Sequence, residues 1–511
     1  MTEAAPRPDA PEFPAGLEWL NVERPLSFAG LRGKIVVLDF WTSCCINCMH
    51  VLSDLKRLED RYPAELAVIG VHSPKYAAER ETATLRQAVL RQGIGHPVVN
   101  DRDLAVWNLY GIPAWPTLVL IDPLGKVVGA LSGEAIFETF DRLIGEILAA
   151  LDPQGLIDRR PLPLRGEPPS DSFLLFPGKV LADPQSPRLF IADSGHHRIV
   201  VHDLSGRTGE EIIGGGDAGF RDGLFADARF RNPQGMALDG RFLYVADTDN
   251  HAIRRVDLEG KTVATAAGTG RQARMFNISG PGGRTPLNSP WDLAARDGFL
   301  YIAMAGAHQI WKMDLAKSYV SPHAGAVEEG RRDGPLREAL FAQPSGIAAN
   351  GKRIYVADSE SSSIRGVDPD PGGTVSTLAG GDLFDFGDAD GEGSAARFQH
   401  PLGIAELDGT LFIADTYNAR IRRLALAEGT VTTLCGGPGA GFRDGADPLF
   451  DEPAGVSAAA GKLYIADRNN SAVRIVDLGT RLTGTLKIGG HQPVLSSPRK
   501  GLIISSFIRR S

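Results

Sequence analysis

Three of the four cysteines in this 511-residue chain lie within five consecutive positions. The run reads Cys44-Cys45-Ile46-Asn47-Cys48, so Cys45 and Cys48 form a C-x-x-C pair. Two thiols at this spacing can form and break a disulfide, and the thiolate of such a pair attacks other disulfides. The run therefore indicates thiol–disulfide chemistry, or alternatively a metal site built from thiolates.

The residues around this run predict a strand followed by a helix. Ile35 to Trp41 is a mostly apolar run, typical of a buried central strand. Thr42 and Ser43 are helix-capping residue types, and apolar residues then recur at helical spacing. Cys45 is therefore expected at the helix N-terminus, where unpaired backbone N–H groups and the helix dipole stabilise a thiolate. Cys48 is expected one turn further along the helix, within reach of Cys45.

The remainder of residues 16–151 predicts an alternation of strands and helices, which is typical of an α/β sheet. The strands are expected at residues 66–71, 118–121 and 126–131, and the helices at 81–92 and 135–151. The central strand would then carry the cysteine run at its end, with helices packed on the sheet.

Phe40 to Cys48 resembles the redox motif of thioredoxin-like proteins, especially the TlpA and peroxiredoxin-related branch. The segment from Gly111 to Thr117 (Gly-Ile-Pro-Ala-Trp-Pro-Thr) is similar to that family's cis-proline segment. The resemblance implies that Pro116 is the cis residue and faces the cysteine pair. It also implies that Cys45 is the attacking thiol and Cys48 the resolving thiol. The neighbours of this redox site would be Trp41, Cys44, Asn47 and Trp115. The family usually has Trp immediately before the first cysteine, and here Cys44 stands in that place.

Two other roles for the thiols stay open. Small cysteines at a helix start can be inert packing residues. The other role is zinc binding, with Cys44, Cys45, Cys48 and His50 as the four ligands. Adjacent cysteines point poorly at one ion, and His50 is expected on another face of the helix. The prediction is therefore a redox site with no metal and no cofactor.

Six similar segments follow a proline-rich stretch at residues 152–170, which is expected to be an extended, semi-rigid connector. Each segment has an apolar strand usually ending in Ala-Asp, a polar turn and a second strand, and the segments lie 52 to 57 residues apart. The Asp recurs as Asp193, Asp247, Asp358, Asp415 and Asp467, with Met304 in the third repeat. Short strands repeated six times at this period predict a β-propeller.

Asp247 to Arg254 and Asp415 to Arg422 resemble NHL repeats. The resemblance implies a six-bladed NHL β-propeller over residues 171–490. The order of the two parts, together with the unusual cysteine run, is similar to the family of NHL repeat-containing protein 2. Residues 1–15 are expected to be a disordered lead-in and 491–511 a C-terminal tail. The fold class is thus multidomain, with an α/β thioredoxin-like domain followed by an all-β propeller.

An arginine recurs on the second strand of four repeats, as Arg254, Arg365, Arg422 and Arg474. The third repeat lacks both this arginine, where it has Trp311, and the recurrent Asp. Loss of both together indicates that Asp and Arg form a structural pair in each blade. The first repeat is an exception, with Asp193 kept and Val200 in the arginine position. The acidic turns near Asp222, Asp333, Asp390 and Asp444 leave a cation site as an open alternative.

Charge and composition limit the classes of partner that the protein can bind. The net charge of −8 gives no electrostatic footprint for nucleic acid and argues against a basic membrane-surface protein. No apolar run approaches the roughly 20 residues that span a bilayer. The N-terminus lacks the basic start and apolar core of a secretory signal, so a cytoplasmic protein is expected. A monomer is expected as well.

Two functions follow from these features. In the first, the protein is a cytoplasmic thioredoxin-like thiol–disulfide oxidoreductase. Its propeller would bind a protein or peptide partner on the propeller face or in a cleft between the domains. In the second, it is a non-catalytic scaffold whose thioredoxin-like unit is a docking module. Fold alone does not decide between them.

Overall fold

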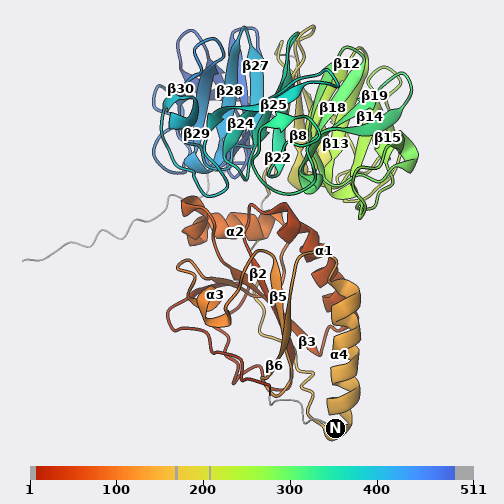
Figure 1. Ribbon diagram of the computed structural model, residues 1–511, viewed down its shortest axis with the longest axis vertical. Helices are drawn as coiled ribbons and strands as arrows, with labels where there is room; N and C mark the ends of the chain where they lie inside the picture. Colours follow the sequence, from red (N-terminus) through yellow and green to blue (C-terminus); the bar gives the residue numbers. More distant parts are fainter. Residues whose placement is uncertain (1–6, 167, 169–170, 207–208, 490–511) are drawn as a thin grey trace, which may run out of the picture.

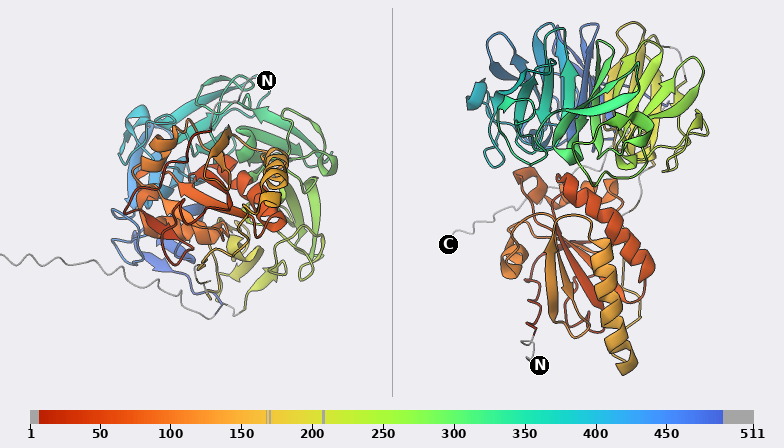
Figure 2. Two further views of the ribbon diagram at one scale, coloured as in Figure 1. Left: turned by 90° about the horizontal axis from the view of Figure 1, so that it is seen from below. Right: turned by 45° about the vertical axis from the view of Figure 1, so that its right-hand side comes forward.

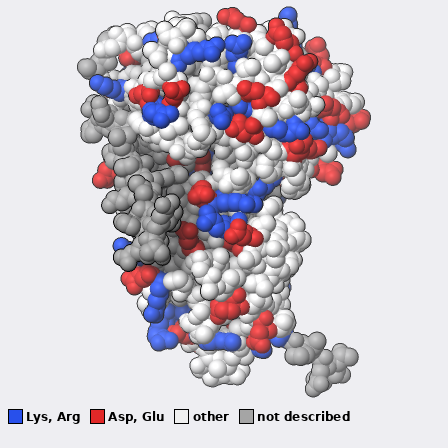
Figure 3. Space-filling model, turned by 90° about the vertical axis from the view of Figure 1, so that its left-hand side faces the viewer, with Lys and Arg blue, Asp and Glu red and all other residues white. Residues whose placement is uncertain are grey.

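The structure is a computed structural model that describes residues 7–489, except 167, 169, 170, 207 and 208. An α/β domain lies against one face of a β-propeller (Figure 1). Viewed along the propeller axis, the α/β domain covers the centre of the ring (Figure 2). Acidic and basic side chains are interspersed on the face shown in Figure 3. None of the helices in the described ranges is long and apolar enough to cross a bilayer.

The first domain contains one mixed sheet with the strand order β1-β4-β3-β2-β5-β6. Its strands are β1 (Glu18–Leu20), β2 (Ile35–Trp41), β3 (Leu66–His72), β4 (Val98–Asn100), β5 (Thr117–Ile121) and β6 (Val127–Ser132). Its helices are α1 (Ile46–Arg61), α2 (Thr82–Arg91), α3 (Ala105–Tyr110) and α4 (Phe137–Leu151). The predicted thioredoxin-like architecture is therefore confirmed, and the predicted strands and helices agree with it to within two residues at each end.

Strand β2 is buried on both faces, which is why its sequence is almost wholly apolar. It pairs in parallel with β3 and antiparallel with β5. One face packs against α1 and α4 through a cluster that includes Leu55 and Ile144. The other face packs against the loops around Phe28 and Leu31 and against α3. This double burial fixes the end of β2, and the cysteine run leaves the sheet from there.

Residues 7–15 were expected to belong to a disordered lead-in, but they lie along the first domain. Phe13 stacks on Phe28 with ring centroids 5.1 Å apart, and the Glu12 carboxylate accepts the Phe28 N–H. Ala10 N–H donates to the Gly125 carbonyl. One aromatic contact and these hydrogen bonds order the segment. Its Pro-rich composition did not indicate that it would be ordered.

The first part of the proline-rich connector also packs on the first domain. The Lys34 ammonium donates to the Arg160 carbonyl, and Asp158 N–H donates to the Gly33 carbonyl. Leu162 packs against the cluster beneath the sheet. The first part of the connector is thus physically part of the thioredoxin-like domain.

Six antiparallel sheets form the propeller in the described part of the chain. Blade 1 has β7 (Val180–Ala182), β8 (Arg188–Asp193), β9 (Arg198–Asp203) and β10 (Glu211–Ile213); blade 2 has β12 (Pro233–Asp239), β13 (Phe242–Asp247), β14 (Ala252–Asp257) and β15 (Thr262–Gly268); blade 3 has β17 (Pro290–Arg296), β18 (Phe299–Met304), β19 (Gln309–Asp314) and β20 (Tyr319–Ala324); blade 4 has β22 (Pro344–Ala349), β23 (Ile354–Asp358), β24 (Ser363–Val367) and β25 (Thr374–Gly380); blade 5 has β27 (Gly403–Leu407), β28 (Thr410–Asp415), β29 (Arg420–Ala425) and β30 (Thr430–Cys435); and blade 6 has β31 (Pro453–Ala459), β32 (Lys462–Asp467), β33 (Ala472–Asp477) and β34 (Thr483–Thr485). Short outer strands extend blades 2 to 5, namely β11 (Gly223–Leu224), β16 (Gly280–Pro281), β21 (Gly334–Pro335) and β26 (Gly391–Glu392). The predicted six-bladed propeller is confirmed.

Blades 1 and 6 are each built from consecutive strands, so neither blade takes a strand from the other end of the propeller. The ring is therefore closed by side-chain packing. One apolar cluster joins the two blades and includes Leu189 from blade 1 and Tyr464 from blade 6. Ala182 N–H donates to Ser457 Oγ across the same seam at 3.0 Å. The first strand of every blade lines a central cavity of about 370 Å³.

The predicted Asp–Arg pairs are present in blades 2, 4, 5 and 6. The distances are 2.8 Å for Arg254–Asp247, 3.1 Å for Arg365–Asp358, 3.4 Å for Arg422–Asp415 and 2.7 Å for Arg474–Asp467. The same four guanidinium groups also pair with Asp222, Asp333, Asp390 and Asp444. The acidic turns considered as a cation site are therefore ion-paired with arginine.

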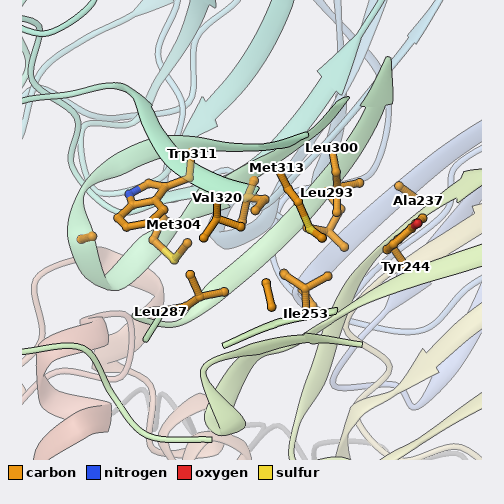
Figure 4. Packing of buried hydrophobic residues seen from close by; sticks show 14 residues of the cluster. Ala237, Tyr244, Ile253, Leu287, Leu293, Leu300, Met304, Trp311, Met313 and Val320 are labelled. Carbon is orange, nitrogen blue, oxygen red and sulfur yellow. The ribbon is translucent and has the colours of Figure 1, made fainter. Parts of the chain in front are cut away.

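Blades 1 and 3 replace this pair in different ways. In blade 1, Asp193 pairs with Arg198 at 2.8 Å, which explains why Val200 can stand in the arginine position. In blade 3, Met304 and Trp311 pack in an apolar cluster (Figure 4). The Trp311 indole N–H donates to Gln309 Oε1 at 2.9 Å. Blade 3 thus exchanges a buried ion pair for apolar packing.

Candidate functional site

The C-x-x-C pair lies where β2 ends and α1 begins. Cys45 is the N-cap residue of α1, and its Sγ accepts the Cys48 N–H at 3.3 Å. The predicted caps Thr42 and Ser43 do not have this role, because both hydroxyls donate to Glu79 Oε1. Cys45 therefore sits at the positive end of the helix dipole, as the sequence predicted.

Burial distinguishes the three thiols of the run. Cys45 is partly exposed, whereas Cys44 and Cys48 are each 1% exposed. Burial raises the pKa of both the Cys44 and the Cys48 thiol well above the usual value, so both are neutral at pH 7. All four cysteines, including buried Cys435, are free thiols in the structure. Cys45 is thus the thiol of the run that solvent reaches.

The predicted neighbours of the pair lie around it. Trp41 is 1% exposed and shares a cluster with Cys48, against which Cys45 and Trp115 pack. The Trp115–Pro116 peptide bond is cis, as predicted. Asn47 lies partly exposed on the first turn of α1, and Cys44 faces away from the pair toward the propeller. The roles of these residues in catalysis stay predictions.

Sequence reasoning missed one titratable group near the pair, Asp39 of β2. Its side chain is 1% exposed, and neither carboxylate oxygen has a hydrogen-bond partner among the described residues. Burial raises the pKa of Asp39 to about 7. Asp39 lies close enough to Cys48 for its charge to contribute to the raised pKa of that thiol. The signal was visible as one acidic residue inside the apolar run Ile35 to Trp41.

The propeller contacts both residues that flank Cys45. Gln343, at the start of blade 4, accepts the Ile46 N–H with its Oε1 at 2.8 Å. Its amide nitrogen donates to the Cys44 carbonyl at 2.9 Å. Ile46 also packs against Trp291 of blade 3. The propeller therefore holds the backbone on both sides of the exposed thiol.

Gln343 belongs to a set of equivalent polar residues, each immediately before a proline that opens a blade. The set comprises Asn232, Ser289, Gln343, His400 and Glu452, with φ between 50° and 56°. Ser289 Oγ lies 2.7 Å from His50 Nε2, and Glu452 pairs with Arg91 at 3.1 Å. The left-handed backbone shared by these turns places their side chains at the face that the first domain covers. The two domains thus pack against each other through these turns.

His50 does not join the cysteines, as the zinc alternative required. Its Nδ1 lies 2.9 Å from Glu134 Oε1, and its Nε2 contacts Ser289. Serine, histidine and glutamate in this order have the spacing of a hydrolytic triad. Ser289 is 1% exposed, so its hydroxyl does not reach a substrate, and the three residues act as a polar contact between the domains.

Comparison with known proteins matches both parts of the chain. A family model described as thioredoxin-like matches residues 33–127, and one described as NHL repeat matches residues 230–255 and 341–366. NHL repeat-containing protein 2 from Homo sapiens is 40% identical over 521 residues, covering 94% of this chain and 71% of that protein. Protein SUPPRESSOR OF QUENCHING 1, chloroplastic, from Arabidopsis thaliana is 43% identical over 510 residues, covering 94% of this chain and 48% of that protein.

Relatives of the first domain alone include an enzyme. Thiol-disulfide oxidoreductase ResA from Halalkalibacterium halodurans is 32% identical over 117 residues, which cover 22% of this chain and 64% of that protein. The chain spans about half the length of the Arabidopsis protein and under three quarters of the human one.

Proposed function

The chain belongs to the NHL repeat-containing protein 2 family, and from this premise we propose that it is a thiol–disulfide oxidoreductase whose propeller binds a protein or peptide partner. The observation that carries the proposal is the difference in exposure between two thiols one helical turn apart. Cys45 is partly exposed at the helix N-terminus, and Cys48 is buried behind it. Disulfide exchange requires two thiols with different access. The substrate must reach the nucleophile, but it must not reach the resolving thiol.

The first half-reaction uses Cys45 alone. Its thiolate attacks one sulfur of a substrate disulfide, the substrate S–S bond breaks, and the other substrate sulfur leaves as a thiolate. The product is a mixed disulfide between Cys45 and the substrate. The Cys48 N–H and the positive end of the α1 dipole stabilise the negative charge on the Cys45 sulfur before the attack.

The second half-reaction requires Cys48 to lose a proton in a buried place. Asp39 is the nearby base, because burial raises the pKa of its carboxyl to about 7. The Cys48 thiolate then attacks the Cys45 sulfur, a Cys45–Cys48 disulfide forms, and the second substrate thiol is released. The substrate gains two electrons, and an external dithiol must reduce the protein again.

The propeller contributes partner recognition in this proposal. It holds the backbone on both sides of Cys45 through Gln343, so a protein bound at the rim of this contact would lie next to the reactive thiol. Binding at two places raises the effective concentration of the partner's disulfide at Cys45. The setting that we propose is the cytoplasm, with the protein acting as a monomer.

Trapping tests the proposal. Cys48→Ser in the full-length protein removes the resolving thiol, so mixed disulfides on Cys45 should accumulate in cell extract and disappear on reduction. Cys45→Ser/Cys48→Ser is the matched control and should trap nothing. If Cys48→Ser forms no mixed disulfide while the protein still captures partners, the non-catalytic scaffold is the better description.

A further inference from the structure

Cys44 meets two potential metal ligands from the propeller. Its Sγ, a carboxylate oxygen of Glu360 and a ring nitrogen of His400 all lie within 4.8 Å of one another. Glu360 comes from the turn after β23 in blade 4, and His400 comes from the turn before β27 in blade 5. Among the residues that the structure describes, this is the one group of three or more His, Cys, Asp or Glu side chains whose ligand atoms lie this close together. The three residues lie at the boundary between the two domains.

The cluster is buried and incompletely hydrogen-bonded. Cys44, Glu360 and His400 are 1%, 4% and 3% exposed. Glu360 Oε2 accepts the Lys75 ammonium at 2.5 Å, which leaves Oε1 facing His400 Nδ1 at 3.1 Å. Neither of these two atoms forms an aligned hydrogen bond within the described structure. Buried polar atoms without hydrogen bonds are costly, and a cation between them would satisfy both.

A bound divalent cation would leave the cluster electrically neutral. Glu79 accepts hydrogen bonds from Thr42, Ser43 and three backbone N–H groups, as a carboxylate does. Glu360 is the second carboxylate, and the Lys75 ammonium pairs with it. Zinc takes histidine as a neutral imidazole and cysteine as a thiolate. With His400 and Cys44 in these forms, the two carboxylates and the thiolate balance the Lys75 ammonium and the divalent cation.

We propose that Cys44, Glu360 and His400 bind a zinc ion between the two domains. Thiolate sulfur, imidazole nitrogen and carboxylate oxygen are the ligand set that zinc takes in proteins, and a water would fill the fourth tetrahedral position. The Glu360 and His400 ligand atoms are 3.1 Å apart, close to the separation of two ligands on one zinc ion, and Cys44 Sγ has to approach them to reach a Zn–S bond length of about 2.3 Å. Binding releases the thiol proton of Cys44.

This site goes beyond the proposed oxidoreductase function and shares neither Cys45 nor Cys48 with it. A zinc ion would tie the thioredoxin-like domain to blades 4 and 5 with bonds stronger than the hydrogen bonds around it. The test must therefore remove the C-x-x-C pair, because a dithiol binds metal by itself.

Cobalt is the probe, because its thiolate and tetrahedral complexes absorb visible light. The full-length Cys45→Ser/Cys48→Ser protein is stripped with a chelator under reducing conditions and titrated with Co²⁺, and Zn²⁺ is then added. We expect one equivalent of Co²⁺ to give a sulfur-to-cobalt band and tetrahedral bands, and Zn²⁺ to abolish them. Cys44→Ser in this background should abolish the sulfur band.

His400→Gln should weaken binding at least tenfold. Glutamine occupies the equivalent turn of blade 4 as Gln343, with φ of 56° against 51° for His400, so the turn accepts it. Glu360→Gln provides the same comparison if that variant does not fold. The matched control is Cys435→Ser, which removes a buried thiol elsewhere and should leave the spectrum unchanged. Absence of the sulfur band in the parent protein, or its survival in Cys44→Ser, would overturn the site.

Discussion

At the scale of single residues, depth below the surface gives three neighbouring cysteines different chemistry. Cys44 and Cys48 are fully buried, and burial raises the pKa of each thiol. Cys45 between them is partly exposed and caps the helix. The sequence predicted this order of the pair because helix position is a local property. It did not predict that Glu360 and His400 lie beside Cys44, since both are more than 300 positions away in the chain.

Alkylation should separate the three thiols. With limiting iodoacetamide on the reduced protein, we expect Cys45 to react at least about tenfold faster than Cys44 or Cys48, because their thiolate forms are suppressed. Peptide mapping by mass spectrometry measures the rates, with buried Cys435 as the internal slow reference. Faster labelling of Cys44 or Cys48 than of Cys45 would contradict the assignment of the nucleophile.

Asp39→Asn should change how stability depends on pH. The pKa of Asp39 is about 7 in the folded protein and about 4 when unfolded. Between these values the unfolded chain is ionised while the folded protein holds the proton. The stability contributed by Asp39 is therefore complete below pH 4 and is lost as pH rises to 7, by up to about 4 kcal/mol. Asn removes this loss, so the variant should gain stability relative to wild type at pH 8 but not at pH 4.

Urea unfolding at both pH values measures the effect of Asp39→Asn. Glu146→Gln, on the exposed face of α4, is the control and should show no such dependence. The same Asp39→Asn variant should retain Cys45 alkylation but resolve mixed disulfides more slowly. Equal stability changes at pH 4 and pH 8 would show that Asp39 does not titrate in this range.

At the scale of elements, apolar periodicity predicted most strands and the helices α1, α2 and α4. It succeeded because each of these elements buries one or both faces in a local pattern. It did not reveal the packing of residues 7–15, whose order depends on a few distant contacts such as Phe13 on Phe28. It also misplaced the cap of α1, because Thr42 and Ser43 bond to Glu79 from another part of the chain.

The blade-to-blade recurrence of Asp and Arg predicts a measurable coupling. Asp358→Ala should cost about 1–3 kcal/mol of folding free energy, because it leaves the buried Arg365 guanidinium without its fully buried carboxylate partner. Arg365→Ala should cost a similar amount, and the double variant should cost less than the sum of the two. Chemical denaturation of the four proteins gives the coupling energy. Strict additivity would mean that the two side chains do not interact. Glu146→Ala, from an exposed pair, should lose little.

At the scale of the whole molecule, the domains meet through turns that repeat around the propeller. Sequence analysis offered a cleft between the domains as a partner site, but it did not predict which residues of the two domains touch. Contacts such as Ile46 with Gln343 join residues 297 positions apart, and no local pattern encodes them. The repeat itself carried a weak signal, since the residue before each blade-opening proline is polar in five blades: Asn232, Ser289, Gln343, His400 and Glu452.

Gln343→Ala should loosen the first turn of α1 in the full-length protein. The variant loses two buried hydrogen bonds, each contributing about 1 kcal/mol, so amide exchange at residues 44–48 should rise by roughly thirtyfold. Asn232→Ala is the matched control, because Asn232 holds the same position in blade 2 and bonds to Asp249 of the propeller. Equal exchange in both variants would show that the propeller does not hold the cysteine turn.

The buried ammonium of Lys179 shows when the propeller can close during synthesis of the chain. Lys179 lies just before blade 1, yet its partners are Asp292 of blade 3 and the carbonyls of Ser345 and Leu402. The last of these is synthesised 223 residues later. Until then the lysine has no site in which its charge can be buried. During translation the early blades can form their own sheets, but the propeller axis is completed only after blade 5 has begun to emerge.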